Sequence, residues 1–213
     1  MLKRDFEIQQ TQKNYSKVAW FYDYWGKLTE TKAISEAISI SGISDNIKVL
    51  DVGVGTGQLF VKIINKNKNG LNFGVDLSPD MISKAKNKLK TVPEKFLLSL
   101  GNAFNLPYKN KSFDFVFSSY VLDLLPEDSF NNVLKEFNRV LKMNSTGVLI
   151  TMSMGSKWSN KIWYLLSKYF PSLLTSCRPV SLKRYLESSG FKIVETRIIS
   201  QNTFPSEIIK FKK

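Results

Sequence analysis

The sequence predicts an α/β fold in which helices cover both faces of a doubly wound, mostly parallel sheet. Two observations predict it. Apolar runs alternate with helical patterns through the middle of the chain, and a glycine-rich turn follows the first run, as in nucleoside-binding sheets. The chain has 213 residues, which is enough for one domain with a complete three-layer core.

The expected elements follow in order along the chain. Ser78-Pro79 starts a helix, with the serine as cap and the proline in the first turn. Further helices are expected at 129–141, where apolar residues recur at helical spacing, and at 181–189. Two final apolar runs, separated by 201–205, predict an antiparallel hairpin at the sheet edge, giving a seven-stranded Rossmann-like sheet. The strands are expected near 47–52, 71–76, 95–100, 113–118, 146–152, 191–199 and 207–211.

The glycine-rich turn carries the strongest functional signal. Residues 49–57 read Val-Leu-Asp-Val-Gly-Val-Gly-Thr-Gly, and Asp76 ends the second apolar run nineteen residues after the last glycine. Gly53, Gly55 and Gly57 allow a tight turn and a close approach of the next helix to a ligand. Asp76 is placed to bind ribose hydroxyls. On the alternative interpretation, the glycines only make a strand-to-helix turn.

The details of the turn favour one nucleoside. A dinucleotide motif requires a glycine where this chain has Gln58. Asp51, just before the turn, would also repel a pyrophosphate held at the helix start. The methionine part of S-adenosylmethionine instead carries an ammonium group that such a carboxylate attracts. The sequence therefore predicts S-adenosylmethionine as the cofactor.

With these residues, the chain resembles the class I S-adenosylmethionine-dependent methyltransferases, in particular the group with quinone-biosynthesis and phospholipid N-methyltransferases. The resemblance extends from about Tyr15 to the C-terminus. Asn102 stands where this family often has an acid beside the adenine, and its amide oxygen can still accept a hydrogen bond. The cofactor residues that the resemblance implies are Asp51, Gly53, Gly55, Gly57, Asp76, Leu77, Met81, Asn102, Ala103 and Ser118.

The chain departs from the family pattern at two further places. Residues 143–147 replace the usual Pro-Gly-Gly turn before the fifth strand, which affects that turn and no cofactor chemistry. Residues 118–122 lack the Gly-Leu-Arg-Asn-like stretch of the quinone enzymes, which weakens the quinone assignment. We expect a single methyltransferase domain over 1–213. It divides into a helical cap (1–45), the cofactor-binding core (46–155), a substrate lid insertion (156–179) and a C-terminal helix and hairpin (180–213).

Composition limits the chemistry. The chain has no histidine, so an imidazole base and a histidine-bound metal are both excluded, and we expect no metal site. Any base must be a carboxylate, a tyrosine, a lysine or water. The single cysteine, Cys177, indicates a reducing compartment. We find no signal peptide pattern or spanning segment and expect a cytoplasmic protein.

The net charge of +13 suits anionic partners. Peripheral contact with an anionic membrane is one interpretation, and a lysine-rich overall composition is the other, because the lysines are spread along the chain.

The acceptor site is expected beyond the fourth strand and under two aromatic segments, 15–25 and 157–174. Either segment can equally be packed against the core. Asp123 can alternatively cap the next turn, and Arg178 can form a structural salt bridge. The residues expected near the mouth of the site are Tyr22, Asp23, Ser119, Tyr120 and Asp123. Of these, the candidate catalytic residues are Tyr120, Asp123 and Tyr22. The candidate substrate-binding residues are Tyr24, Trp163 and Arg178.

The predicted function is methyl transfer from S-adenosylmethionine to a small, hydrophobic acceptor that is lipid-like or quinone-like. RNA or protein methylation is an alternative that the positive charge favours, although no clustered basic groove or added nucleic-acid-binding domain is evident. A non-catalytic module that binds the cofactor as a regulatory ligand is a third. The sequence leaves the oligomeric state open.

Overall fold

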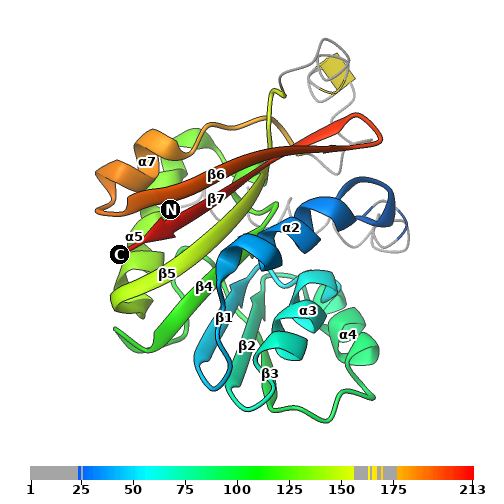
Figure 1. Ribbon diagram of the computed structural model, residues 1–213, viewed down its shortest axis with the longest axis vertical. Coiled ribbons are helices and arrows are strands. Elements are labelled where there is room, and N and C mark those ends of the chain that lie inside the picture. The colour runs from blue at the N-terminus through cyan, green and yellow to red at the C-terminus, as the bar shows by residue number, and fades with distance from the viewer. Residues whose placement is uncertain (1–23, 25, 156–162, 164, 167–168, 170–176) are drawn as a thin grey trace.

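The computed structural model describes residues 24, 26–155, 163, 165–166, 169 and 177–213 (Figure 1). Within these residues, seven strands form one sheet in the order β3-β2-β1-β4-β5-β7-β6. The first five strands pair in parallel, and β7 is antiparallel to both β5 and β6. The strands are β1 (Lys48–Val52), β2 (Leu71–Asp76), β3 (Phe96–Leu100), β4 (Phe113–Ser119), β5 (Leu141–Met152), β6 (Lys192–Gln201) and β7 (Phe204–Lys212). The predicted fold class is confirmed.

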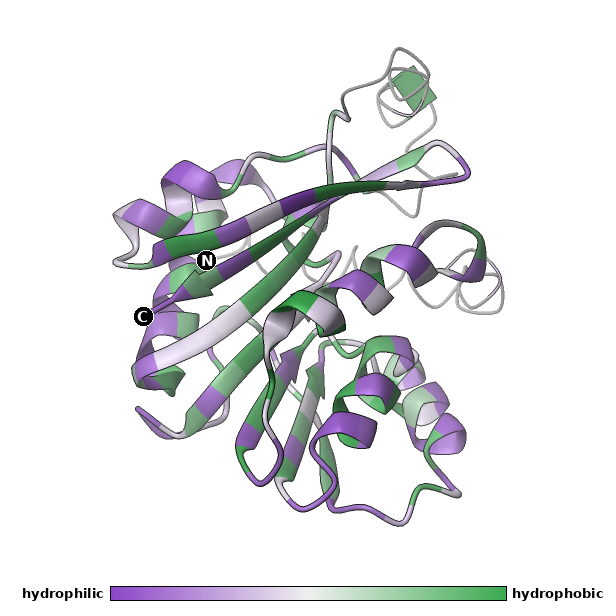
Figure 2. Ribbon diagram, viewed as in Figure 1, coloured by the Kyte–Doolittle hydropathy of each residue, from purple (hydrophilic) through white to green (hydrophobic). Residues whose placement is uncertain are grey.

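Helices cover both faces of this sheet (Figure 1). On one face lie α2 (Thr31–Ser41), α3 (Gln58–Lys66) and α4 (Pro79–Lys88), and on the other α5 (Phe130–Val140) and α7 (Lys183–Ser188). Neighbouring strand residues point to opposite faces, so Val49 joins the core under the first group and Leu50 the core under the second. In Figure 2, hydrophobic colour follows the central strands, and hydrophilic colour alternates with it along the helices.

Local sequence explains where the helices begin and end. Ser78 caps α4 by accepting a hydrogen bond from the Met81 N–H at 3.4 Å, and Pro79 occupies the first turn, as predicted. In α5 the residues at helical spacing are all buried, namely Phe130, Val133, Leu134, Phe137 and Val140. Gly42 ends α2 in the left-handed conformation, with φ of 64°.

Two regions differ from the expected boundaries. The hairpin strands are longer than predicted because the turn uses only Asn202 and Thr203, both at positive φ. β5 follows α5 directly, and the expected turn lies inside this strand. Leu141 pairs with Phe113 and the next pair is Thr146 with Phe115, so residues 142–145 form an irregularity, with Asn144 at φ of 61°.

The sheet topology locates a ligand cleft. From β1 the chain continues to β2 on one side, whereas β4 pairs with the other side of β1. The carboxyl ends of β1 and β4 therefore flank a topological switch point, where open α/β sheets bind ligands. No helix in the described part of the chain combines the length and apolar character that crossing a membrane requires.

Candidate active site

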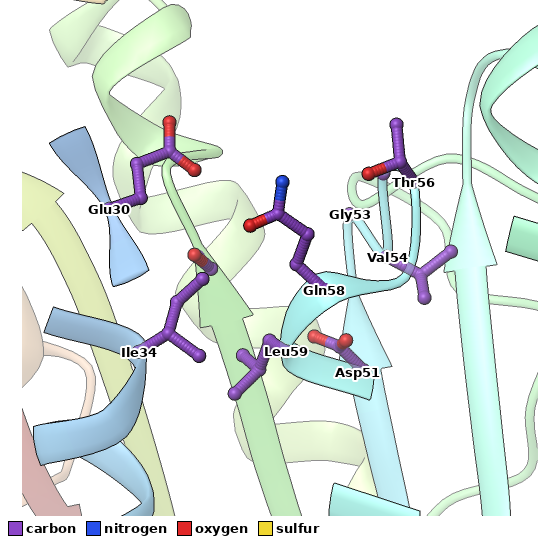
Figure 3. Close-up of a pocket in the computed structure, with 10 residues that line it drawn as sticks. Glu30, Ile34, Asp51, Gly53, Val54, Thr56, Gln58 and Leu59 are labelled. Atoms are coloured by element: carbon purple, nitrogen blue, oxygen red, sulfur yellow. The ribbon is translucent and has the colours of Figure 1, made fainter. Parts of the chain in front are cut away.

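A pocket opens at the switch point, with an empty volume of about 330 Å³ that includes open solvent. It is bounded by the end of β1, the glycine-rich turn, the start of α3, the start of α2 and the end of β4 (Figure 3). Its lining residues are Glu30, Ile34, Asp51, Gly53, Val54, Gly55, Thr56, Gln58, Leu59 and Ser119. Of the predicted cofactor residues, Asp51, Gly53 and Gly55 lie together in this lining.

Asp51 is the most unusual residue of this pocket. Its side chain is buried, with 1% of the residue exposed, and among the described residues neither carboxylate oxygen has a hydrogen-bond partner. Burial, and secondly the charge of Asp76, raise the pKa of this carboxyl well above its ordinary value. A buried carboxyl without partners is costly unless a ligand supplies them. The site therefore fits a ligand with a cationic hydrogen-bond donor.

The glycine-rich turn is held against β2. Gly53 has φ of 76°, and a Cβ there would lie 2.1 Å from Cγ2 of Val121, so only glycine fits. The Asp76 carboxylate accepts hydrogen bonds from the Gly55 N–H at 2.8 Å and the Ser78 N–H at 2.9 Å. Burial nevertheless raises the pKa of Asp76. Asp76 therefore fixes the turn, while its oxygens retain acceptor capacity for a ligand.

Glu30 contributes a second acid that the motifs did not indicate. It directly precedes α2, is 5% exposed, and reaches into the pocket from the α2 side (Figure 3). Burial, and secondly the charge of Asp123, raise its pKa from 4.5 to about 8. The sequence gives little signal for this role, because an acid beside a helix start is usually a capping charge.

The end of β4 places two serines differently. Ser118 is buried and donates a hydrogen bond to the Val52 carbonyl at 2.8 Å, whereas its neighbour Ser119 lines the pocket. Alternation along the strand explains this difference. The serine that lines the pocket is therefore one residue beyond Ser118, the predicted cofactor residue.

Tyr120 and Asp123 lie behind the pocket. Tyr120 has φ of 53°, is 2% exposed, and its hydroxyl is 2.7 Å from the Ser206 hydroxyl. Asp123 is fully buried and accepts a hydrogen bond from the Met152 N–H at 3.0 Å. Burial raises the pKa of Asp123 to about 7 although this N–H opposes the shift. Neither residue lines the pocket.

The predicted adenine end lies beyond β2 and β3. Asn102 is half-buried, and its side-chain oxygen accepts a hydrogen bond from the Phe104 N–H at 3.0 Å. Ala103 packs against the second core, Leu77 is half-buried, and Met81 is buried in the first turn of α4. None of these four belongs to the pocket lining, nor does Gly57, which precedes α3.

The predicted substrate residues are scattered. Trp163 donates a hydrogen bond to Thr203 at 2.9 Å and packs edge-on against Phe204, so it contacts the β6–β7 turn. The Arg178 guanidinium donates a hydrogen bond to the Leu125 carbonyl and lies 5.8 Å from the Phe130 ring centre. Tyr24 is 60% exposed. Tyr22, with most of the segments 15–25 and 157–174, lies outside the described residues.

Comparisons with known proteins agree with this geometry. Residues 49–144 match the methyltransferase domain family. A demethylmenaquinone methyltransferase of Bacillus cytotoxicus is 29% identical over 172 residues, which are 80% of this chain and 68% of that protein. Together these similarities support a class I S-adenosylmethionine-dependent methyltransferase. Its cofactor is S-adenosylmethionine, whose bound sulfonium makes a methyl group electrophilic.

Solved structures show the same fold in other methyltransferases. The putative methyltransferase in the Haloferax volcanii complex with the Trm112 activator has a TM-score of 0.76 and 15% identity, covering 95% of this chain and 96% of that one. The magnesium protoporphyrin IX methyltransferase of Synechocystis, solved with bound SAH, has a TM-score of 0.70 and 17% identity, covering 86% and 83%. At identities of 15% and 17%, these similarities show the fold alone.

Proposed function

We propose that this methyltransferase acts on a small, hydrophobic acceptor of the quinol type. The main support for this cofactor site is the Asp51 carboxyl. It is buried in the pocket at the switch point and has no hydrogen-bond partner among the described residues. It would accept hydrogen bonds from the ammonium group of the cofactor. The likeness to a demethylmenaquinone methyltransferase favours the quinol acceptor.

The sheet order gives the proposed direction of the cofactor. Asp51 ends β1, Asp76 ends β2, and Asn102 follows β3, and these strands are neighbours. The ammonium, the ribose hydroxyls and the adenine amino group would bind to these three residues in turn. The Asn102 oxygen retains one acceptor position beside the Phe104 N–H. Gly53 and Gly55 would let the methionine part approach the backbone.

The surroundings of the pocket support an apolar acceptor. Ile34 and Leu59 line it, and Met154, just beyond β5 at the same edge of the sheet, is 54% exposed. We retain the proposal that residues 156–179 form a substrate lid and that residues 1–45 form a cap. A peripheral contact with anionic membranes remains a prediction from the charge of +13.

The test is to incubate the protein with radiolabelled methyl donor and host extract, and then to separate lipids, nucleic acid, protein and aqueous small molecules. Label in the organic phase is expected, and its product can be identified. Asp51→Asn should abolish this transfer, whereas Asp114→Asn should not, because Asp114 pairs with Lys142 at the opposite end of β4. Label confined to the aqueous pool would contradict a hydrophobic acceptor.

A macromolecular substrate is the second candidate. The net charge of +13 favours it. In the same experiment, label in the RNA or protein fraction would replace the quinol proposal.

A further inference from the structure

The sheet order shows where the reacting atoms would lie in the pocket. Under the proposed function, the cofactor extends across the ends of β3, β2 and β1 in that order. Its ammonium end is at Asp51, on β1, and the next strand is β4, whose last residue, Ser119, lines the pocket. The acceptor would therefore lie on the β4 side, which is also the side bounded by the start of α2.

Glu30 is the acid that the fold presents on this side. It lines the pocket together with Ile34 and Ser119, and it is 5% exposed. Its backbone is fixed by helical hydrogen bonds, from its N–H to the Gly26 carbonyl and from the Ile34 N–H to its carbonyl, both at 2.9 Å. No ion pair holds its carboxyl among the described residues. The backbone of Glu30 is therefore held in place at the pocket, while no cation among the described residues pairs with its carboxyl.

Two of the candidate catalytic residues, Asp123 and Tyr120, have hydrogen-bond partners away from the pocket. Asp123 accepts a hydrogen bond from Met152, and Tyr120 is bonded to Ser206, and both side chains are enclosed behind the pocket. Both residues interact electrostatically with Glu30. The charge of Asp123 raises the pKa of Glu30, and the charge of Glu30 raises the pKa of Tyr120. They can influence the charge of Glu30 without contacting an acceptor.

We propose that Glu30 is the residue that accepts a proton from the acceptor, and that this acceptor carries an ionisable hydroxyl, as a quinol does. This inference rests on the proposed function. The hydroxyl proton passes to a carboxylate oxygen of Glu30, and the electron pair of the O–H bond remains on the acceptor oxygen. The deprotonated acceptor oxygen then uses that electron pair to form the bond to the methyl carbon, while the electron pair of the carbon–sulfur bond stays on the cofactor sulfur. The proton held by Glu30 afterwards passes to solvent.

The experiment compares wild type with Glu30→Gln, Glu30→Asp and the control Glu36→Gln, using chemically reduced 1,4-naphthoquinone as the acceptor probe. Glu36 lies on the same helix but pairs with Arg197 away from the pocket. Calorimetry measures cofactor affinity, and label transfer measures kcat as a function of pH. Glu30→Gln should bind the cofactor within about twofold of wild type, while kcat falls by about 100- to 10,000-fold, the usual contribution of a general base.

The pH profile separates a proton acceptor from a structural residue. Wild-type kcat should rise with pH as Glu30 ionises, Glu30→Gln should lose this rise, and Glu30→Asp should keep part of it. Among the described residues, Asp123 and Tyr120 interact electrostatically with Glu30 and Asp51 lines the same pocket, and all three remain in each variant.

The outcomes distinguish the two proposals. A wild-type protein that binds the cofactor but methylates no quinol refutes the proposed function and the inference with it. A wild-type protein that methylates the quinol while Glu30→Gln retains kcat within about threefold overturns the inference alone, since a general base typically contributes far more. Equal loss of cofactor affinity and kcat in Glu30→Gln also overturns it.

Discussion

Replacing Glu30 with glutamine should stabilise the folded protein, and the gain should grow with pH. The carboxyl is buried, and its pKa is raised from 4.5 to about 8. An acid with a raised pKa in the folded state binds its proton more tightly there than in the unfolded chain. Its contribution to stability is therefore complete below the unfolded pKa and is lost as pH rises through the folded pKa. Glutamine has nearly the same shape and does not titrate.

The two pKa values set the size of this effect. Their difference limits the pH-dependent change in the free energy of unfolding to about 5 kcal/mol, because each pKa unit corresponds to about 1.4 kcal/mol. Integrated between about pH 5 and about pH 9, the wild type should lose roughly 4 kcal/mol that Glu30→Gln retains. Asp51 and Asp123 remain in both proteins, so the difference between the two stability curves isolates the Glu30 contribution.

Urea unfolding at a series of pH values measures this difference. The free energy of unfolding of wild type, Glu30→Gln and Glu36→Gln is obtained at each pH without added cofactor. Glu36→Gln should run parallel to wild type, because its carboxyl pairs with Arg197 near the surface. A constant difference between Glu30→Gln and wild type from about pH 5 to about pH 9 would refute the reasoning, since it would mean that Glu30 titrates alike in both states.

Three further changes test the site and the core. Asp51→Asn should weaken S-adenosylmethionine binding by about 1.5–3 kcal/mol, the typical worth of a hydrogen bond to a charged group, with Asp114→Asn unchanged in the same calorimetric titration. Asp76→Ala should lose about as much cofactor affinity; unchanged affinity would show that the ribose does not bind there. Phe137→Ala, at a fully buried position of α5, should cost about 3–5 kcal/mol in urea unfolding while the folded fraction keeps its cofactor affinity.

The fold was predictable because its signals are local. Apolar runs, the Ser78-Pro79 helix start and the spacing of Phe130, Val133 and Phe137 each depend on residues that are close in sequence. The same holds for the turn around Asp51. The irregularity in β5 was harder to place, because it depends on how residues 142–145 fit between two pairs with β4.

The acceptor side of the pocket depends on contacts that the sequence does not display. Glu30 and Asp51 are twenty-one positions apart, and no motif joins them, yet both line one pocket. The choice between Ser118 and Ser119 depends on which face of β4 meets the pocket. The position of Tyr120 after β4 suggested a pocket residue, but its positive φ directs the side chain toward Ser206.

The concentration of raised pKa values around one pocket is itself a functional argument. Asp51, Glu30 and Asp123 are each at most 5% exposed, and burial is the largest cause of the pKa shift in all three. Such carboxyls cost stability when they ionise, so a core selected only for stability would contain apolar side chains there. S-adenosylmethionine brings an ammonium and a sulfonium, and either cation favours the ionised form of a nearby acid. Binding the cofactor should therefore lower the pKa of Asp51 and release protons, which couples occupation of the site to the charge on its acids.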